Sequence, residues 1–381
     1  MLIKNLRIVP VNGNTIDCGW IRFDEKIQAV GDMKNCPSEE GMVFDPGFCA
    51  YPGFVDAHSH LGLIGDAQDI DCEDCNESTG PSTPQMRALD GLNPFDPCWD
   101  EALKAGITTV CVTPGSANPI AGMACIVKTY GHGLPPARII AQTNALKVAL
   151  GENPKRIYGK RDIMPASRMG IAALIRQKFV QAQEYLNKRL DKKNPAFDPE
   201  LDVLANVLEN KLPLHIHAHR ADDMLTAMRL AEEFELPHLI VHGTQGYLIS
   251  ETLAEKGTAV LCGPLLACRC KPELSGATPA NPGILSKAGV TVAIVTDHPE
   301  IPSQYLPLTA GLAVREGMTR DRALRAITLT PARLLGIDGR VGSLEAGKDA
   351  DIVIFKKDPL SLEAKPVMVF AAGQRIDCST Q

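Results

Sequence analysis

The sequence lacks any apolar run of the roughly 18–20 residues that a helix needs to cross a bilayer. It also lacks the Gly-x-x-x-x-Gly-Lys-Ser/Thr phosphate loop and the glycine fingerprint of dinucleotide-binding folds. No internal repeat and no low-complexity segment is present. The net charge of −6 at pH 7 argues against a surface for nucleic acid or anionic membrane. The remaining composition, 45% apolar and 22% charged, is that of a soluble globular protein.

Cysteine is present, but without the regular spacing of a disulfide framework. The 12 cysteines are scattered over 381 residues, and residues 1–8 are charged and strand-like, unlike the apolar core of a signal peptide. We therefore expect a cytoplasmic protein whose cysteines are reduced thiols. The close pairs Cys72–Cys75 and Cys268–Cys270 are interpreted as incidental, because a single short cysteine spacing is weak evidence for zinc.

Both ends of the chain consist of short strand-like stretches separated by turns, without helical periodicity. A chain of 381 residues is longer than one core usually supports, so a large and a small domain are expected. We predict that residues 1–50 and 345–381 pack into one small β domain, and that residues 51–344 form a large domain inserted between them. The predicted terminal strands are Leu2–Pro10, Trp20–Phe23, Ile27–Val30, Met42–Phe44, Ala350–Phe355, Pro366–Ala371 and Arg375–Ile376.

The middle of the chain alternates apolar strand-like runs with helical stretches, which indicates an α/β domain. Eight strand candidates, apolar on both faces, favour a closed (β/α)8 barrel, with an open doubly wound sheet as the alternative. Residues 114–144 contain no clear helix, so the third and fourth strands are the weakest part of this prediction. The strand candidates are Phe54–His60, Thr108–Thr113, Cys125–Lys128, Ala145–Leu150, Leu212–His219, His238–His242, Ala259–Cys262 and Val290–Thr296, and the helix candidates are Trp99–Ala105, Arg168–Leu190, Asp222–Phe234 and Gly246–Lys256.

Two histidines, His58 and His60, stand at the far end of the first predicted strand of this domain. Residues two apart in a strand share a face, so both imidazoles point the same way. Two neutral imidazoles on one face can hold a divalent metal. The pair alone could equally be exposed loop histidines, so the prediction depends on further ligands.

Later strands supply those ligands. The fifth predicted strand carries His215, His217 and His219 at alternate positions, which are easiest to explain if they face the barrel lumen. We favour His217 as a ligand, with His219 as second choice and His215 as deeper support. His242 closes the next strand and Asp297 the last one. Asp297 could instead cap a helix. Because it stands at a strand end, as the histidines do, a metal site is favoured.

The stretch Pro52-Gly-Phe-Val-Asp-Ala-His-Ser-His60, the strand-end His217 and His242, and Asp297 resemble motifs of the amidohydrolase superfamily of metal-dependent hydrolases. Residues 342–353 resemble the return into that family's small β-sandwich. The likeness covers nearly the whole chain and is greatest to the imidazolonepropionase-like and prolidase-like branch. It implies a TIM-type (β/α)8 barrel with a small β-sandwich made from both chain ends, and an active site at the C-terminal strand ends.

The resemblance also implies one or two divalent metal ions, zinc being the expected metal. His58 and His60 would hold the more buried ion together with Asp297, and His217 and His242 would hold the second.

Two-metal members of the family usually bridge their ions through a carboxylated lysine or a glutamate. Lys147 is our first choice for this role, Lys128 the second and Glu152 the third. A lysine in an apolar strand is otherwise unfavourable, because an unpaired buried ammonium group is costly. Either lysine could instead extend to the surface or pair with a carboxylate.

The predicted function is hydrolysis of a C–N bond in an amide, cyclic amide or dipeptide-like small molecule by metal-activated water. Asp297 would accept the water's proton and deliver it to the leaving nitrogen, and His219 could stabilise the oxyanion. Arg220, Asp222 and Asp223 could meet a charged substrate, although both acids also suit the first turn of the next helix. Hydrolytic deamination of a ring and a non-catalytic scaffold that has kept the barrel are the alternatives. Such barrels often form homo-oligomers, but the sequence shows no interface.

Overall fold

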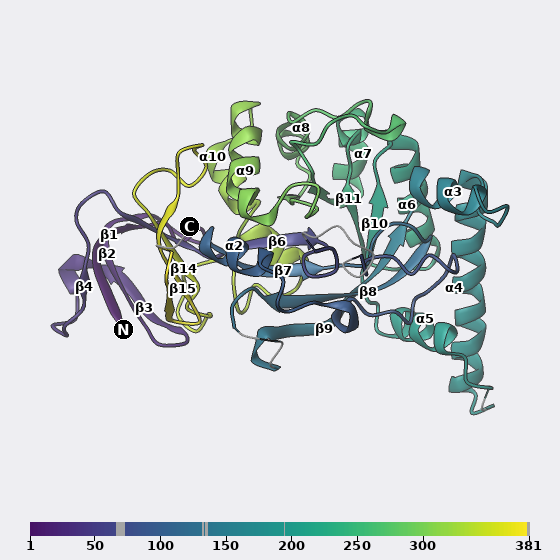
Figure 1. Ribbon diagram of the computed structural model, residues 1–381, viewed down its shortest axis with the longest axis horizontal. Coiled ribbons are helices and arrows are strands. Elements are labelled where there is room, and N and C mark those ends of the chain that lie inside the picture. Colours follow the sequence, from purple (N-terminus) through teal and green to yellow (C-terminus); the bar gives the residue numbers. More distant parts are fainter. Residues whose placement is uncertain (66–72, 132, 134–135, 194, 379–381) are drawn as a thin grey trace.

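The computed structural model describes residues 1–65, 73–131, 133, 136–193 and 195–378. The structure contains two eight-stranded sheets. The first lies toward one end of the long axis, and the second occupies the middle of the molecule (Figure 1). The first sheet is built from both ends of the chain, as expected, because β5 pairs with β14 in antiparallel fashion. Its strands are β1 (Leu2–Ile8), β2 (Ile16–Phe23), β3 (Ile27–Asp32), β4 (Met42–Val43), β5 (Cys49–Pro52), β14 (Ile352–Phe355), β15 (Pro366–Ala371) and β16 (Gln374–Ile376).

The second sheet is a nearly closed barrel whose strands follow one another in chain order. The eight predicted strands are all present in it, with bounds that differ by a few residues. They are β6 (Phe54–Ser59), β7 (Ile107–Val112), β8 (Ile120–Lys128), β9 (Ile139–Ala149), β10 (Leu214–Ala218), β11 (His238–His242), β12 (Ala259–Cys262) and β13 (Val292–Ile294).

The barrel closes between β6 and β13 without a ladder of strand pairing among the described residues. Individual hydrogen bonds connect the two strand ends instead. The Asp56 carboxylate accepts one from the Thr296 hydroxyl and one, at 3.4 Å, from the Thr296 amide. The Asp297 amide donates to the His58 carbonyl at 3.2 Å. The first and last strands are therefore held together directly at the level of the predicted metal ligands.

One strand runs against the others, which corrects the expected regular alternation of strands and helices. β8 pairs antiparallel with both β7 and β9. Antiparallel neighbours need only short connections, whereas parallel strands need a long crossover such as a helix. This explains why residues 114–144 show no clear helical pattern.

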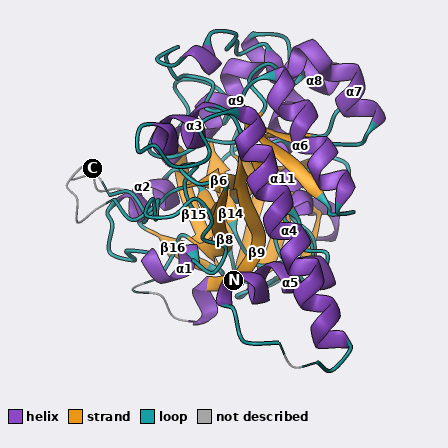
Figure 2. Ribbon diagram, turned by 90° about the vertical axis from the view of Figure 1, so that its right-hand side faces the viewer, coloured by secondary structure: helices purple, strands orange, loops and turns teal. Residues whose placement is uncertain are grey.

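Helices cover the outside of the barrel sheet (Figure 2). Among the described residues, no helix is both long and apolar enough to cross a membrane. The α-helices are α1 (Ala88–Gly91), α2 (Cys98–Lys104), α3 (Glu152–Gly159), α4 (Arg168–Leu190), α5 (Pro199–Glu209), α6 (Ala221–Glu233), α7 (Ser250–Glu255), α8 (Asn281–Lys287), α9 (Leu306–Arg315), α10 (Arg320–Arg325) and α11 (Leu329–Leu334), and the short 3-10 helices are η1 (Met33–Asn35), η3 (Pro136–Arg138), η4 (Gly246–Ile249), η5 (Pro272–Leu274) and η6 (Ser303–Tyr305).

The apolar packing of β10 fixes which way its histidines face. Leu214, Ile216 and Ala218 belong to the core cluster that also contains residues of α4 and α6, such as Phe179 and Met224. Alternate residues of a strand point to opposite faces. The three histidines of this strand therefore face inward, as the sequence predicted.

Candidate metal centre

The predicted ligands converge at one end of the barrel sheet, although they come from four strands far apart in the sequence. Each lies at or just beyond the C-terminal end of its strand, and all except His60 are buried. They are His58 and His60 from β6, His217 and His219 from β10, His242 from β11, and Asp297 three residues beyond β13.

Asp297 lies among the histidines. Its Oδ1 is 3.1 Å from His58 Nε2 and 3.4 Å from His60 Nε2. Its Oδ2 is 3.9 Å from His242 Nδ1. His58, His242 and Asp297 each offer one donor atom within 4.8 Å of the others, a spacing at which one cation can be shared.

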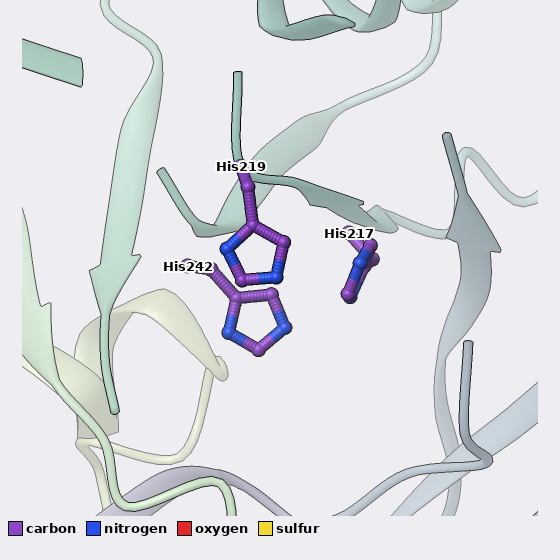
Figure 3. Close-up of side chains that lie close together, drawn as sticks. All are labelled: His217, His219 and His242. Atoms are coloured by element: carbon purple, nitrogen blue, oxygen red, sulfur yellow. The ribbon is translucent and has the colours of Figure 1, made fainter. Parts of the chain in front are cut away.

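A second group of three imidazoles, which again includes His242, is shown in Figure 3. The rings of His219 and His242 are stacked, with centroids 4.4 Å apart, and the His217 ring stands across both at 4.8 and 4.5 Å. Each of the three offers a nitrogen within 4.8 Å of the others. Because His242 belongs to both groups, the two groups form one continuous cluster.

Backbone carbonyls fix the tautomers of two of these histidines. His60 Nδ1 lies 2.8 Å from the Thr113 carbonyl oxygen, and His242 Nδ1 lies 2.8 Å from the Gly263 carbonyl oxygen. A carbonyl can only accept, so each Nδ1 carries the proton and each Nε2 keeps its lone pair. Metal-binding histidines are commonly oriented in this way.

A left-handed backbone brings His242 into the cluster. Ile240, two residues earlier on β11, belongs to the apolar cluster between the barrel sheet and helices α4 and α6. Strict alternation along the strand would therefore place His242 outside the barrel as well. His242 has a φ of 74°, a conformation uncommon for residues other than glycine. Asp297 has a φ of 57°. Non-glycine residues held in this region are concentrated at functional sites.

Burial keeps the imidazoles in the neutral form that binds metals. Desolvation lowers the pKa of His58 and of His219 to about 3, and lowers the pKa of His242 well below its usual value. Burial acts to raise the pKa of Asp297, but His242, His58 and His60 outweigh it and hold that pKa well below its usual value. Metal ligands must be deprotonated, so these three imidazoles and this carboxylate would bind an ion without first losing a proton.

Lys147 lies at the site, as predicted. Its Nζ is fully buried and 3.4 Å from His58 Nε2. Burial lowers its pKa to about 8. No carboxylate of the described residues lies within 4.0 Å of Nζ, so its charge is not neutralised by an ion pair.

The other two bridging candidates are placed elsewhere. Lys128 is buried, but its Nζ lies 2.6 Å from Asp351 and 3.0 Å from Asp349, away from the histidines. Because β8 is antiparallel, Lys128 faces Thr109 near the start of β7, at the opposite end of the barrel. The prediction of Lys128 as second choice for the metal-bridging residue is therefore wrong. The alternative, that this lysine pairs with a carboxylate, is correct. Glu152 opens α3, and its carboxylate accepts from the Glu273 amide at 3.4 Å.

The charged residues after β10 form ion pairs with their neighbours. Arg220 binds Asp222 through two contacts of 2.9 Å, and Asp223 accepts from Arg168 at 2.8 and 3.2 Å. His215 lies deeper on β10, opposite Lys147 of β9.

The described cysteines of the two close pairs form no disulfide. Cys268 and Cys270 are exposed free thiols, and Cys75 is also free. Cys72 lies outside the described residues.

Sequence reasoning missed Glu273, a buried glutamate of η5 whose Oε1 lies 3.7 Å from His219 Nε2 and 4.0 Å from His217 Nε2. It stands in the irregular segment after β12, where no periodicity reveals which residues turn inward. His217 Nε2 and Glu273 Oε1 have no hydrogen-bond partner among the described residues. Buried polar atoms without a partner, beside neutral imidazoles that have a free lone pair, fit a site for a divalent cation.

The fold and the site together define the class of protein. It has a barrel sheet with a cluster of histidines and one aspartate at the C-terminal ends of its strands. A model of the amidohydrolase family matches residues 49–376. A crystal structure of an amidohydrolase from Thermotoga maritima MSB8 aligns over 99% of both chains, with a TM-score of 0.93 and 39% identity. The chain belongs to the amidohydrolase family, and the resemblance drawn from its motifs is confirmed.

Curated relatives carry related names. The amidohydrolase tasK of Hapsidospora irregularis is 30% identical over 366 residues, covering 88% of this chain. This chain spans only 37% of that relative's length. An imidazolonepropionase of Symbiobacterium thermophilum is 28% identical over 331 residues, covering 81% of this chain and 75% of that protein.

Proposed function

We propose that this member of the amidohydrolase family is a metal-dependent hydrolase that cleaves the C–N bond of an amide, cyclic amide or dipeptide-like small molecule. The observation that carries the proposal is the position of Asp297, with one carboxylate oxygen beside His58 and His60 and the other toward His242. The names of the relatives, amidohydrolase and imidazolonepropionase, support the same type of reaction.

The finer description of the fold is part of this proposal. It comprises a TIM-type (β/α)8 barrel of residues 51–344 and a small β-sandwich of residues 1–50 and 345–381. A cytoplasmic location, zinc as the metal and a small-molecule substrate belong to the same proposal.

His58, His60 and Asp297 would hold one ion, and His217 and His242 would hold a second, with Lys147, once carboxylated, as the bridging residue. A bound divalent ion lowers the pKa of its water from about 15.7 toward 7 and polarises a carbonyl oxygen. Asp297 has a carboxylate held ionised by its neighbours, so it is able to accept a proton from water. The same carboxylate would then protonate the leaving nitrogen.

His219 would stabilise negative charge on the reacting oxygen. Its Nδ1 lies 2.7 Å from the Thr244 hydroxyl, which orients the ring. A cavity of about 420 Å³ opens next to His242 and is lined by Thr244 and Leu265 among others. Its size and its mixture of polar and apolar lining residues suit a small molecule.

Purified protein loaded with zinc tests the proposal when it is incubated with a panel of amides, cyclic amides and dipeptides. We expect hydrolysis that is lost in the His58→Asn and Asp297→Asn variants. Release of ammonia from a ring substrate, without cleavage of any amide, would favour deamination instead. Protein that binds no metal after chelator-free purification, and turns over no substrate, would contradict both.

A further inference from the structure

Glu273 is a buried carboxylate that is only half satisfied. It lies in η5, after β12, and its Oε2 accepts the Glu152 amide proton at 3.0 Å. Its Oε1 has no hydrogen-bond partner among the described residues. A buried carboxylate oxygen without a donor is unfavourable, and such groups in folded proteins call for an explanation.

The free oxygen is directed at two imidazoles of the histidine cluster. Oε1 lies 3.7 Å from His219 Nε2 and 4.0 Å from His217 Nε2. Among the lysines and arginines of the described residues, only Lys271 lies within 4.0 Å, with its Nζ 3.6 Å away on a partly exposed side chain. The other charged groups that act on Glu273, Glu152 and Asp223, are acids, whose carboxylates cannot neutralise its charge.

His217 has the complementary need. A neutral imidazole carries a proton on one nitrogen and a lone pair on the other, and its Nε2 is buried without a partner. A His217 that uses Nδ1 toward a metal must place its Nε2–H against an acceptor. His60 and His242 solve the same problem with backbone carbonyls, but the described residues offer His217 only the Glu273 carboxylate.

We propose that Glu273 is a positioning residue that accepts the Nε2–H of His217 and so leaves the Nδ1 lone pair of that ring free to bind a metal ion. The inference rests on the proposed metal site and deepens it, because it predicts which residue outside the ligand set determines metal affinity. Carboxylates that hold ligand histidines in this way typically change metal affinity about 10–100-fold when they are removed.

Two substitutions separate the parts of this role. Glu273→Gln keeps an oxygen acceptor but removes the charge, and Glu273→Met keeps the volume but removes the acceptor. Glu251→Gln, at an exposed carboxylate of α7, is the matched control for loss of one negative charge. Zinc affinity is measured by competition with a chromophoric chelator, and the His217 tautomer by ¹⁵N NMR of the metal-free protein, assigned with His217→Asn.

The metal-free wild type should show His217 protonated on Nε2. We expect Glu273→Met to lose about 10–100-fold in zinc affinity and to shift His217 toward the Nδ1–H form. Glu273→Gln should keep the wild-type tautomer and most of the affinity, and Glu251→Gln should match the wild type in both measurements. Thermal unfolding of the metal-free variants checks that they are folded.

Three results would overturn the inference. Glu273→Met could bind zinc as the wild type does, with an unchanged tautomer. Glu273→Gln could fall as far as Glu273→Met, which would make the charge decisive and Glu273 a direct ligand. His217 could also be protonated on Nδ1 in the wild type. The tautomer is read without metal or substrate, so its outcome is independent of whether the proposed hydrolysis is correct.

Discussion

Asp297 Oδ1 lies 3.1 Å from His58 Nε2, and this contact joins β6 to the segment just beyond β13, where the barrel sheet closes. The Asp297 amide also donates to the His58 carbonyl, so the backbone holds both residues in place. Closure of the barrel and assembly of the site therefore depend on the same pair of residues. A mutation that removes only the carboxylate charge should leave this backbone contact intact.

The first prediction concerns that charge. Asp297→Asn keeps the shape of the side chain but removes its ability to accept and deliver a proton. We expect kcat to fall by about 10²–10⁴, the usual contribution of general acid–base catalysis, without loss of the fold. The measurement is steady-state hydrolysis of whichever amide the substrate panel identifies. Asp45→Asn, at an exposed acid of the chain-end region, should retain the wild-type rate. Full activity of Asp297→Asn would show that another group moves the proton.

The second prediction concerns metal removal. A cluster rich in imidazoles prefers zinc or cobalt to magnesium, which prefers oxygen ligands. We expect a chelator to abolish activity, zinc or cobalt to restore it, and magnesium to fail. An ion at about 100 times its Kd should stabilise the folded protein by about 2.7 kcal/mol, measurable as a higher unfolding temperature. Protein that keeps its activity and unfolding temperature after exhaustive chelation would contradict a metal mechanism.

The sequence predicts strands and helices of this fold well where the segment has a single clear apolar or periodic pattern. The bounds of His238–His242, Ala259–Cys262 and Arg168–Leu190 agree with the structure, because each is an apolar or periodic run with a clear end. The antiparallel β8 was not predicted as such. Apolar residues on both faces indicate a buried strand but carry no information about its direction.

The site could be predicted as far as strand ends determine it. His58, His60, His217, His242 and Asp297 follow strands of one barrel sheet, so their convergence follows from topology. Their detailed orientation does not follow, since the left-handed φ that turns His242 inward is not visible as a pattern. Glu273 could not be predicted because it lies in an irregular segment, where only tertiary packing determines what faces the cluster.

The third prediction concerns Lys147, the candidate bridging residue. Its Nζ is buried beside His58 without a carboxylate partner among the described residues, so a role in binding the second ion is its best explanation. We expect Lys147→Met to reduce bound zinc by about one ion per chain and to lower kcat strongly. Lys155→Met, at an exposed lysine of α3, should leave the metal content unchanged. Elemental analysis decides the outcome, and an unchanged zinc content in Lys147→Met would exclude this role.

The fourth prediction concerns the buried ion cluster at the other end of the barrel. Lys128 is fully buried between Asp349 and Asp351, whereas Lys26 reaches Asp349 at 3.3 Å from a side chain that is 57% exposed. Removing one partner of a buried pair leaves an uncompensated charge and typically costs about 3–5 kcal/mol. An exposed pair contributes only about 0–1 kcal/mol. We therefore expect Lys128→Met to lower the free energy of unfolding far more than Lys26→Met, as measured by urea denaturation. Equal losses in the two variants would contradict the assignment of Lys128 to the structural core.

The fifth prediction is the pH dependence of the same cluster. Burial acts to raise the pKa of Asp349, but Lys128 and Arg340 outweigh it and hold that pKa below the usual value of 3.8. In acid the unfolded chain then binds the proton before the folded protein does, so this group stabilises the fold above about pH 4 and loses its contribution as the pH falls further. We expect the free energy of unfolding of the wild type to decline as the pH is lowered from about 5 to about 2.5. The decline should be shallower in Asp349→Asn, which has no proton to gain at this position. If the two slopes agree, the carboxylate does not have the lowered pKa that its contacts with Lys128 and Arg340 produce.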